Sequence, residues 1–573
     1  MLEPMKLRLA PSLCLLAAAP AAFAQTLLLD LVGGAVGDRY GASVVPIGDV
    51  NADGIPDLAV GAPRAGVGGE VYVTSGVDGS VIRTLTAPGQ VSPPDSETMF
   101  GASLCGIGDQ DGDGVGDLVI GIPGQKVFGA RNGAVQVVSG ATGTSLTYAL
   151  GVNANSQFGT TVAATGDMNG DGLDDLWIGA PTATYQTGRP GLATLLSIGT
   201  STYLRTIGGL SEGGVFGESL AVLPDVDGDG LDDLVVGAPS DTTSAAPVAG
   251  SVTAFSGATG AVLYRLEGVA TAEFFGSSIA AVPDANADGI TDVAIGVENG
   301  NVAGSINGRV ALVSGADGSL IRNIPGQNTF ASFGDSVAGL ADLDGDGAGE
   351  VLVGEPFLDS NGVVVGAAHV ISGATGQTIY SLTGDEAGAL LSFPVADVGD
   401  LDGDGLPEFA VSSNFHAGAA TGAVSVYLGA DAPVIRQCQN AIPNSTGQVS
   451  VMGFEGTARV AFNRATLRTD RLPPGVFGIY ITSRVYQNLP IPGGSSGQLC
   501  IGGALGRFNH VRQASPSGSY SLDIDLTSLP TTNAFVAATP GETWHFQTWH
   551  RDIPAGGSSL GSNFSDTVGI LMR

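Results

Sequence analysis

The nine residues Asp225–Asp233 read DVDGDGLDD, with an acid at positions 1, 3, 5 and 9 and glycine at position 6. The chain contains this pattern seven times, and successive copies begin 60, 58, 58, 59, 58 and 58 residues apart. Such regular self-similarity indicates a repeat architecture. The seven nonapeptides, called the acidic loops below, are residues 49–57, 109–117, 167–175, 225–233, 284–292, 342–350 and 400–408.

The segments around each acidic loop keep the same spacing. After each loop, a short apolar run ends in a turn such as Gly61-Ala62-Pro63, and an alternating run then ends in Ser-Gly, as in Val252 to Gly257. Each unit therefore contains about four short strands separated by Gly, Pro and Asp, with no helical periodicity. Nine residues before each loop stands an aromatic-glycine pair, replaced in the seventh unit by Leu391-Ser392: Tyr40-Gly41, Phe100-Gly101, Phe158-Gly159, Phe216-Gly217, Phe275-Gly276 and Phe333-Gly334.

Four strands per unit in seven units predict an all-β fold, a seven-bladed β-propeller. The last unit lacks a fourth strand after Val424–Gly429, but an extra strand-like run, Thr26–Leu31, precedes the first aromatic-glycine pair. We predict that this N-terminal run completes the seventh blade. The two ends of the repeat array would then pair and leave no open sheet edge.

The acidic loops contain the residue types of a calcium site. Alternate carboxylates, with a glycine that permits a sharp turn, are spaced as in a loop that surrounds a hard cation, and the position-7 carbonyl is a further ligand. Asp and Glu fill 25 of the 28 positions 1, 3, 5 and 9, a density that is repulsive without a cation. We predict up to seven Ca²⁺ ions, bound more weakly where position 3 is Asn. The predicted ligands are Asp49, Asn51, Asp53, Ile55 and Asp57; Asp109, Asp111, Asp113, Val115 and Asp117; Asp167, Asn169, Asp171, Leu173 and Asp175; Asp225, Asp227, Asp229, Leu231 and Asp233; Asp284, Asn286, Asp288, Ile290 and Asp292; Asp342, Asp344, Asp346, Ala348 and Glu350; and Asp400, Asp402, Asp404, Leu406 and Glu408.

Two other interpretations of the acidic loops fit less well. An EF-hand or dockerin loop needs an acid at position 12 and a helix after it. Position 12 here is aliphatic in all seven loops, from Val60 to Val411, and lies in β-type sequence, so each loop joins two strands. A plain Asp-Gly hairpin turn needs Asp at one position, not four. Calcium suits such carbonyl and carboxylate cages better than magnesium does.

The N-terminus has the pattern of a secretory signal peptide. Lys6 and Arg8 precede an apolar run from Leu9 to Phe23, and small residues close it before Gln25. A membrane anchor, the alternative, needs about 20 apolar residues, and no later stretch is that long. We expect a secreted protein, extracellular or at the cell surface, with a signal peptide at 1–24, a propeller at 25–430 and a second domain at 431–573.

The composition excludes some classes of function. Fifty-five acids against 22 bases give a net charge of −33, which argues against a nucleic-acid partner. The chain is 43% hydrophobic with a positive mean hydropathy, which argues against disorder. Five scattered histidines show no zinc-type spacing. Ser336 and Cys105 occupy repeat positions that hold Ser and small apolar residues in other units, so we interpret both as structural, Cys105 as a small buried residue.

The repeats end near Asp431, and the remaining sequence predicts a small β-sandwich. Its cysteines, Cys438 and Cys500, are expected to pair. Trp544 and Trp549 are five residues apart, so on a strand they face opposite sides and at least one belongs to the core. The patch around them is a candidate sugar-stacking platform. The predicted strands include Ala458–Phe462, Gly478–Ser483, Tyr520–Ile524 and Thr543–Thr548.

An aromatic-Gly pair, a D-x-[DN]-x-D-G loop and a Gly-Ala-Pro turn together resemble the FG-GAP repeat of the integrin α propeller, over roughly residues 26–430. The resemblance implies calcium on the lower face of some blades and partners on the opposite face. All seven loops keep the pattern here, which is fuller than in integrins. The sequence shows no integrin stalk or transmembrane helix, so heterodimer formation is not carried over. The C-terminal region resembles modules of secreted bacterial proteins, without an activity that this resemblance defines.

These observations lead to two hypotheses. The first is a calcium-binding propeller that acts as an adhesion or recognition scaffold for an extracellular protein or glycan, as a monomer and without catalytic residues. The second is an extracellular hydrolase or lyase with its site in the propeller cleft or the C-terminal domain. A paired acid and base outside the acidic loops would favour the enzyme.

Overall fold

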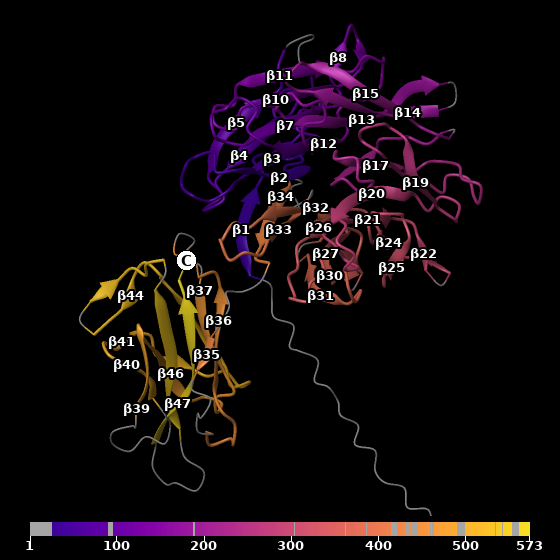
Figure 1. The fold of residues 1–573 in the computed structure, drawn as a ribbon. Helices are drawn as coiled ribbons and strands as arrows, with labels where there is room; N and C mark the ends of the chain where they lie inside the picture. The colour runs from indigo at the N-terminus through magenta and orange to yellow at the C-terminus, as the bar shows by residue number, and fades with distance from the viewer. Residues whose placement is uncertain are drawn as a thin grey trace, which may run out of the picture.

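The chain forms two bodies built from strands and turns, shown in Figure 1. The computed structural model describes residues 26–573 except 90–94, 187–188, 212, 303, 361, 385–386, 414–420, 430–434, 438–443, 459, 461–462, 464, 490–498, 533, 541, 553–560 and 573. Within these residues there is no α-helix, and hence none that could cross a membrane. The predicted all-β fold is confirmed.

The larger body contains seven four-stranded antiparallel sheets within the described residues. In each sheet the second strand is buried where it runs beside the first, as in Asp57–Ala62, because other sheets cover both of its faces there. The sheets, starting from the strand that touches the neighbouring sheets, are β2 (Ser43–Gly48), β3 (Asp57–Ala62), β4 (Glu70–Thr74) and β5 (Val81–Thr86); β6 (Ser103–Ile107), β7 (Asp117–Ile122), β10 (Ala134–Val138) and β11 (Ser145–Leu150); β12 (Val162–Thr165), β13 (Asp175–Gln186), β14 (Arg189–Ser197) and β15 (Thr202–Gly208); β16 (Ser219–Leu223), β17 (Asp233–Ala238), β18 (Ser251–Phe255) and β19 (Val262–Glu267); β20 (Phe275–Val282), β21 (Asp292–Val297), β24 (Arg309–Val313) and β25 (Leu320–Pro325); β26 (Val337–Leu340), β27 (Glu350–Glu355), β30 (Ala367–Ser372) and β31 (Thr378–Thr383); and β32 (Leu391–Gly399), β33 (Glu408–Ser413), β34 (Ala423–Tyr427) and β1 (Leu27–Val32).

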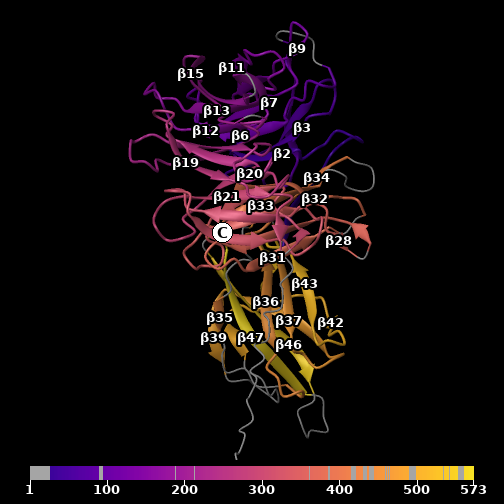
Figure 2. The same cartoon turned by 90° about the vertical axis from the view of Figure 1, so that its right-hand side faces the viewer.

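The sheets close into a ring. The first strands contact one another in the order β2, β6, β12, β16, β20, β26 and β32, and β32 returns to β2. β1 pairs antiparallel with β34, with Leu31 opposite Val424 and Leu29 opposite Val426. The prediction that the N-terminal strand completes the last sheet is therefore confirmed. Figure 1 shows the sheets as the blades of a β-propeller around one axis, and Figure 2 shows the same sheets from the side.

Adjacent blades are joined at the aromatic-glycine pairs. Gly101 has φ +82°, and its carbonyl accepts a hydrogen bond from Ser43 Oγ of the preceding blade at 2.9 Å. The same carbonyl lies so close to Gly61 that a Cβ there would be 2.1 Å from it, so the Gly-Ala-Pro turn has to begin with glycine. Equivalent bonds join Ser103 to Gly159, Thr161 to Gly217, Ser219 to Gly276 and Ser278 to Gly334.

Ser336 occupies this junction in the sixth blade. Its Oγ accepts the N–H of Val395 at 3.0 Å, in the next blade. The structural role that the repeat position predicts for Ser336 is therefore confirmed. In the seventh blade Ser392 replaces the glycine with φ +81°, and its Oγ accepts the N–H of Glu355 at 3.0 Å.

Three arginines reinforce alternate junctions. Arg83 of the first blade donates to the carbonyls of Gly140 and Ala141 in the second blade, at 2.8 and 2.6 Å. Arg205 binds Ala258 and Thr259 in the same way, and Arg322 binds Gly373 and Ala374. Each guanidinium therefore holds the turn that follows the third strand of the next blade.

Three two-stranded hairpins extend from the connections between second and third strands. These connections leave the sheets at the edge opposite the acidic loops, because successive antiparallel strands alternate in direction. Phe128 at the tip of the first hairpin is 99% exposed. The hairpins are β8 (Lys126–Val127) with β9 (Ala130–Arg131), β22 (Asn301–Val302) with β23 (Ser305–Ile306), and β28 (Asp359–Ser360) with β29 (Val363–Val364).

The C-terminal residues form the second body, with a core of its own. Side chains of both its larger sheets, such as Leu467 and Phe546, share one hydrophobic cluster, so the sheets pack face to face as a sandwich. A six-stranded sheet contains β35 (Ile435–Gln437), β47 (Gly561–Leu571), β46 (Thr543–Asp552), β38 (Phe477–Ser483), β41 (Gly506–Arg507) and β42 (Arg512–Gln513); a three-stranded sheet contains β36 (Val451–Gly456), β37 (Ala465–Asp470) and β43 (Tyr520–Ile524); two hairpins contain β39 (Val485–Leu489) with β40 (Leu499–Gly502) and β44 (Leu529–Pro530) with β45 (Phe535–Val536).

The sequence misplaced one strand of this body. Ala458 and Val460 lie outside strands, because β36 and β37 pair as a hairpin and the chain has to turn between them. The other residues of the predicted run 458–462 lie outside the described residues. Cys500 is disulfide-bonded, whereas Cys438, its predicted partner, lies outside the described residues, as does the predicted signal peptide 1–24.

The first prediction concerns ring closure by β1. Leu29 is 1% exposed and packs in the cluster shared by the first and last blades. We expect Leu29→Ala to lower the free energy of unfolding by about 2–5 kcal/mol, measured by urea denaturation. Val36→Ala, at a side chain that is 70% exposed, is the control. Equal stability of the two variants would contradict closure by β1.

Candidate metal centres

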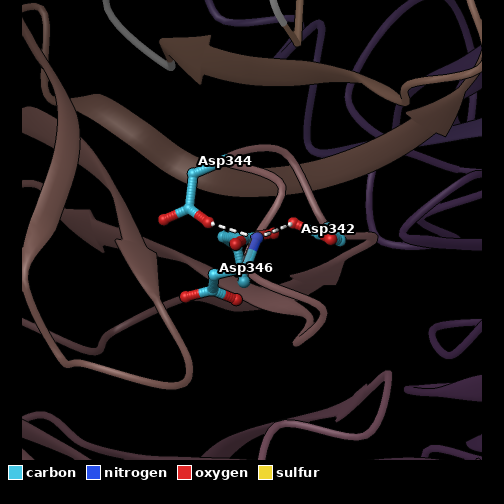
Figure 3. Close-up of side chains that lie close together, drawn as sticks. Asp342, Asp344 and Asp346 are labelled. Carbon is cyan, nitrogen blue, oxygen red and sulfur yellow. Dashed lines mark hydrogen bonds between the residues drawn. The ribbon is translucent and has the colours of Figure 1, made fainter.

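In each acidic loop the first aspartate organises the backbone. Asp342 Oδ1 accepts the N–H groups of Gly345 and Asp346 at 2.6 and 3.1 Å, and its Oδ2 accepts that of Gly347 at 2.8 Å. Figure 3 shows this carboxylate turned toward the loop interior, with Asp344 on the other side of the Asp346 amide. Such bonds favour the charged form and hold the pKa of Asp109 and of Asp167 below the usual range.

The loops turn through residues with positive φ. The glycine at position 6 has φ between +85° and +92° in all seven loops, for example +90° at Gly347. Position 4 is also left-handed, with Ala52 at +61° and Ala287 at +64° in two loops. The predicted need for glycine at position 6 has a physical reason, because a residue with a side chain is strained at such a positive φ.

The serine of the Ser-Gly motif is part of the site, which the sequence did not indicate. Ser372 Oγ donates to Asp346 Oδ2 at 3.2 Å, while Asp346 Oδ1 accepts the N–H of Ala348 at 3.0 Å. The sequence feature that could have revealed this serine is its constant separation of 26 or 27 residues from the position-5 aspartate. The other pairs are Ser139 with Asp113, Ser197 with Asp171, Ser256 with Asp229, and Ser314 with Asp288.

The position-9 acid is buried where the loop enters the second strand, at most 1% exposed in every blade. In the second blade Asp117 Oδ2 accepts the N–H of Gln110 at 2.7 Å, and Oδ1 accepts that of Gly140 at 3.0 Å. This carboxylate therefore ties its loop to the Ser-Gly turn. Each carboxylate oxygen retains a second lone pair, which leaves it able to bind a cation as well.

The pKa of the position-9 acids is raised, first because burial removes water from the carboxylate. The pKa of Glu350 rises to about 8, and the loop aspartates Asp344, Asp342 and Asp346 add to the rise by repulsion. The pKa of Glu408 also rises to about 8, and that of Asp292 to about 6. These sites contain more negative charge than their own hydrogen bonds neutralise.

Four loops bring carboxylate oxygens within 4.8 Å of one another, as a cation requires. The fullest set is Asp342, Asp344, Asp346 and Glu350. Glu350 Oε1 is buried there without a hydrogen-bond partner, so this donor set fits a hard cation such as calcium. The other sets are Asp109, Asp111 and Asp117; Asp225, Asp227 and Asp229; and Asp400, Asp402 and Asp404.

The remaining predicted ligands are less fully assembled. The loops at 49–57, 167–175 and 284–292, with Asn at position 3, contain none of the grouped acids, and weaker binding there stays a prediction. Asn169 Nδ2 donates to Asp171 Oδ2 at 3.0 Å, so an internal bond occupies an oxygen that a metal would use. The position-7 carbonyls stay predicted ligands.

Next to the loops, an axial cavity of about 760 Å³ lies between the inner strands. Two position-8 acids line it and bind the preceding blade: Asp174 Oδ2 accepts the N–H of Gly108, and Asp232 Oδ2 that of Gly166. Cys105, predicted as a buried residue, is half-buried and lines this cavity, because its strand borders the axis. Burial raises the pKa of the Cys105 thiol, which disfavours the reactive thiolate form.

Outside the loops, one arrangement has the residue types of a hydrolase. His369 Nδ1 lies 3.0 Å from Ser381 Oγ, and its Nε2 lies 3.0 Å from Oε2 of the buried Glu355. A buried acid with a basic partner recurs as Arg265 with Asp241 and Arg309 with Glu273. We therefore interpret His369 as the basic partner of Glu355 and not as a catalytic base.

A pair of neighbouring acids, Asp335 and Glu298, also lies outside the acidic loops. The pKa of Asp335 rises to about 7 because it is buried and faces Glu298. Neither residue lines the axial cavity.

The FG-GAP repeat family model matches residues 40–74, 158–194 and 216–255. Integrin alpha-5 of Xenopus laevis is 30% identical over 260 residues, covering 42% of this chain and 24% of that protein. Integrin alpha-V of Gallus gallus is 29% identical over 210 residues, covering 34% and 20%. The matches therefore span about a quarter of those relatives or less.

Among solved structures, the WD40 domain of Neurospora crassa Pan2 matches with a TM-score of 0.41 and 8% identity, over 70% of this chain and 94% of that one.

The second prediction isolates the backbone requirement of the loops. A Cβ on Gly347 would meet nothing within 4 Å, so Gly347→Ala changes only the strain at φ +90°. We expect a loss of about 1–2 kcal/mol in the free energy of unfolding, read by chemical denaturation. Gly34→Ala, at a site that is also open but lacks positive φ, should change stability little. An unchanged free energy of unfolding for Gly347→Ala would contradict the predicted backbone strain.

The third prediction concerns pH. Because the native pKa values of Glu350 and Glu408 are about 8, the metal-free native state binds more protons than the unfolded state between about pH 4.5 and 8. The contribution of these two carboxyl groups to the free energy of unfolding is fully present below pH 4.5 and is lost as the pH rises through 8. We expect the free energy of unfolding of the metal-free protein to fall from pH 5 to 8.

The control is the double variant Glu350→Gln, Glu408→Gln, which should show a shallower decline. Calcium should flatten the decline in the unmodified chain, because a cation favours the ionised carboxylates. A metal-free stability that rises over this range would contradict the assignment.

Proposed function

We propose that this chain, a β-propeller with FG-GAP repeats that is similar to integrin alpha chains, is a secreted, calcium-binding recognition scaffold. Its partner would be an extracellular protein or a glycan. Integrin-like propellers suggest adhesion or recognition at the family level, and the finer assignment to calcium and to secretion is ours. The proposal includes the division of the chain into a signal peptide at 1–24, the propeller at 25–430, the second domain at 431–573, and a monomeric state.

The observation that carries the proposal is the donor set of the loop at 342–350. Four carboxylates lie within 4.8 Å of one another, and the most buried of them has an oxygen without any hydrogen-bond partner. Repulsion among such charges is relieved by a hard cation, and calcium accepts the flexible geometry of a loop of carboxylates and carbonyls. Bound calcium would then fix the connection between the first two strands of each blade.

The proposed partner face is the face of the propeller opposite the acidic loops, where the second and third strands of each blade are connected. The three short hairpins extend from it, and Phe128 at the tip of the first is fully exposed. Next to this tip, Lys126 and Arg131 form ion pairs with Asp95 and Glu97. An exposed aromatic surrounded by charged side chains is typical of an interaction surface.

The alternative, an extracellular hydrolase or lyase, finds less support. The Ser381–His369–Glu355 arrangement has the residue types of a nucleophile, base and acid. However, Glu355 also accepts hydrogen bonds from Asn328 Nδ2, at 3.1 and 3.3 Å, and two other blades pair a buried acid with arginine, Asp241 with Arg265 and Glu273 with Arg309. The arrangement is explained by the hydrogen bonding of a buried acid.

The fourth prediction tests calcium directly. A ligand that binds only the native state stabilises it by about 2.7 kcal/mol at a hundred times its Kd. We expect the melting temperature to rise when millimolar calcium replaces chelator. Asp344→Asn, which keeps the acceptor for the Asp346 N–H but removes one charge, should reduce the number of tightly bound ions, counted by elemental analysis.

Asp317→Asn is the matched control, because Asp317 binds only Ser319 in a turn outside the acidic loops. Equal stability in chelator and in calcium would refute the structural role of the metal.

A further inference from the structure

The outer face of the six-stranded C-terminal sheet contains a cavity of about 540 Å³. Its volume falls in the range of about 300–1,000 Å³ that is usual for small-ligand sites. We call it the Trp549 cavity; its lining includes Trp549, Arg551, Phe477, Ile479, Arg507 and Val511.

Strand register explains why these side chains meet. Ile479 pairs with Trp549 across β38 and β46, and Ile481 pairs with Arg507 across β38 and β41. Paired residues lie on the same face of a sheet, as do residues two apart on one strand. Trp549 therefore projects away from the core, whereas Trp544 on the other face is 1% exposed within it. The prediction that the two tryptophans face opposite sides is confirmed.

The charge of the cavity is opposite to that of the whole chain. Its lining contains two arginines and no Asp or Glu, in a protein of net charge −33. Arg468 and Arg484 of the same body form ion pairs with Asp470 and Glu542. Within the part of the chain that the structure describes, Arg507 and Arg551 have no such partner, so their guanidinium groups are available to an anionic ligand.

The apolar part of the lining is accessible as well. Trp549 is half-buried, and Phe477 and Val511 are 50% and 58% exposed. An indole presents a flat apolar face on which the C–H groups of a sugar ring can pack, and large aromatic side chains supply much of the contact energy in such sites. The planar fork of arginine matches a carboxylate with two parallel hydrogen bonds.

We propose that the Trp549 cavity binds a carboxylate-bearing sugar of an acidic glycan. Trp549 stacks on the sugar ring, and Arg551 and Arg507 bind its carboxylate. This inference deepens the proposed role as a recognition scaffold, on which it rests, by naming the chemistry of one partner. A sugar acid is favoured over an acidic peptide because it combines a rigid ring face with the carboxylate, and the cavity offers partners for both.

The experiment uses the full mature chain and isothermal titration calorimetry with three probes: methyl β-D-glucuronide, methyl β-D-glucoside, and triaspartate. The two glycosides differ only in the carboxylate. We expect saturable binding of the glucuronide, at least tenfold tighter than binding of the glucoside or triaspartate. Arg551→Gln, Arg507→Gln and Trp549→Ala should each weaken glucuronide binding by tenfold or more.

Arg512→Gln is the matched control, since Arg512 is exposed on the adjacent strand β42 but does not line the cavity; its affinity should stay within twofold. Trp549→Phe, which keeps a ring, should bind more tightly than Trp549→Ala if the alanine variant is folded. No glucuronide binding, equal binding of the glucoside or of triaspartate, or equal affinities of the Arg551 and Arg512 variants would overturn the proposal.

The outcome is separable from that of the proposed function. Calcium stabilisation is read from melting temperature and depends on the acidic loops, none of which lies in the C-terminal body. Loss of glucuronide binding with calcium stabilisation intact would therefore overturn the cavity assignment alone. Absence of calcium stabilisation would overturn the calcium-binding part of the proposed function, whatever the glucuronide does.

Discussion

Each blade buries one carboxylate at the point where its acidic loop becomes a strand, and the propeller depends on holding that charge. In five blades both oxygens of this acid accept backbone N–H groups, one from the loop and one from the turn after the third strand. The acid thereby fixes the loop to the sheet. Burial raises its pKa, so the site is stable either with a proton or with a cation nearby. This constraint explains why acids are concentrated in loops of constant length.

The junctions between blades depend on the absence of side chains. The carbonyl of a left-handed glycine approaches the turn of the preceding blade so closely that only glycine fits there, as at Gly61 and Gly121. The serine two residues later donates to a carbonyl of the following blade, so the hydrogen bonds continue around the ring. At the closing blade Ser392 takes the glycine position, and its hydroxyl oxygen accepts a hydrogen bond from the Glu355 N–H that glycine could not accept. The irregular unit is thus where the first strand of the propeller pairs with the last repeat.

Much of this organisation was predictable from the sequence because it repeats. Seven copies of a short pattern identify the turn glycines, the acids and the N-terminal strand that completes the last sheet. The role of Ser372 was not predictable, since Ser-Gly also reads as an ordinary strand end, and its bond to Asp346 joins residues 26 apart through the fold. The half-buried position of Cys105 depends on which strand borders the axis. The Arg83 clamp likewise depends on how two blades are packed.

The C-terminal body has no repeat, and there the alternation of side chains was the useful signal. It separated Trp544 from Trp549, but it could not bring Arg507, which is 42 residues before Trp549, to the same cavity; the pairing of β38 with both β41 and β46 does that. Residues 431–573 contain ten Arg and eight acids, so this body lacks the negative charge of the propeller. At physiological ionic strength charges are screened beyond about 8 Å. The local arginines around Trp549, more than the net charge of −33, therefore decide which ligands the cavity attracts. One chain can then combine a cation-binding ring with an anion-binding cavity, because each acts through its own near neighbours.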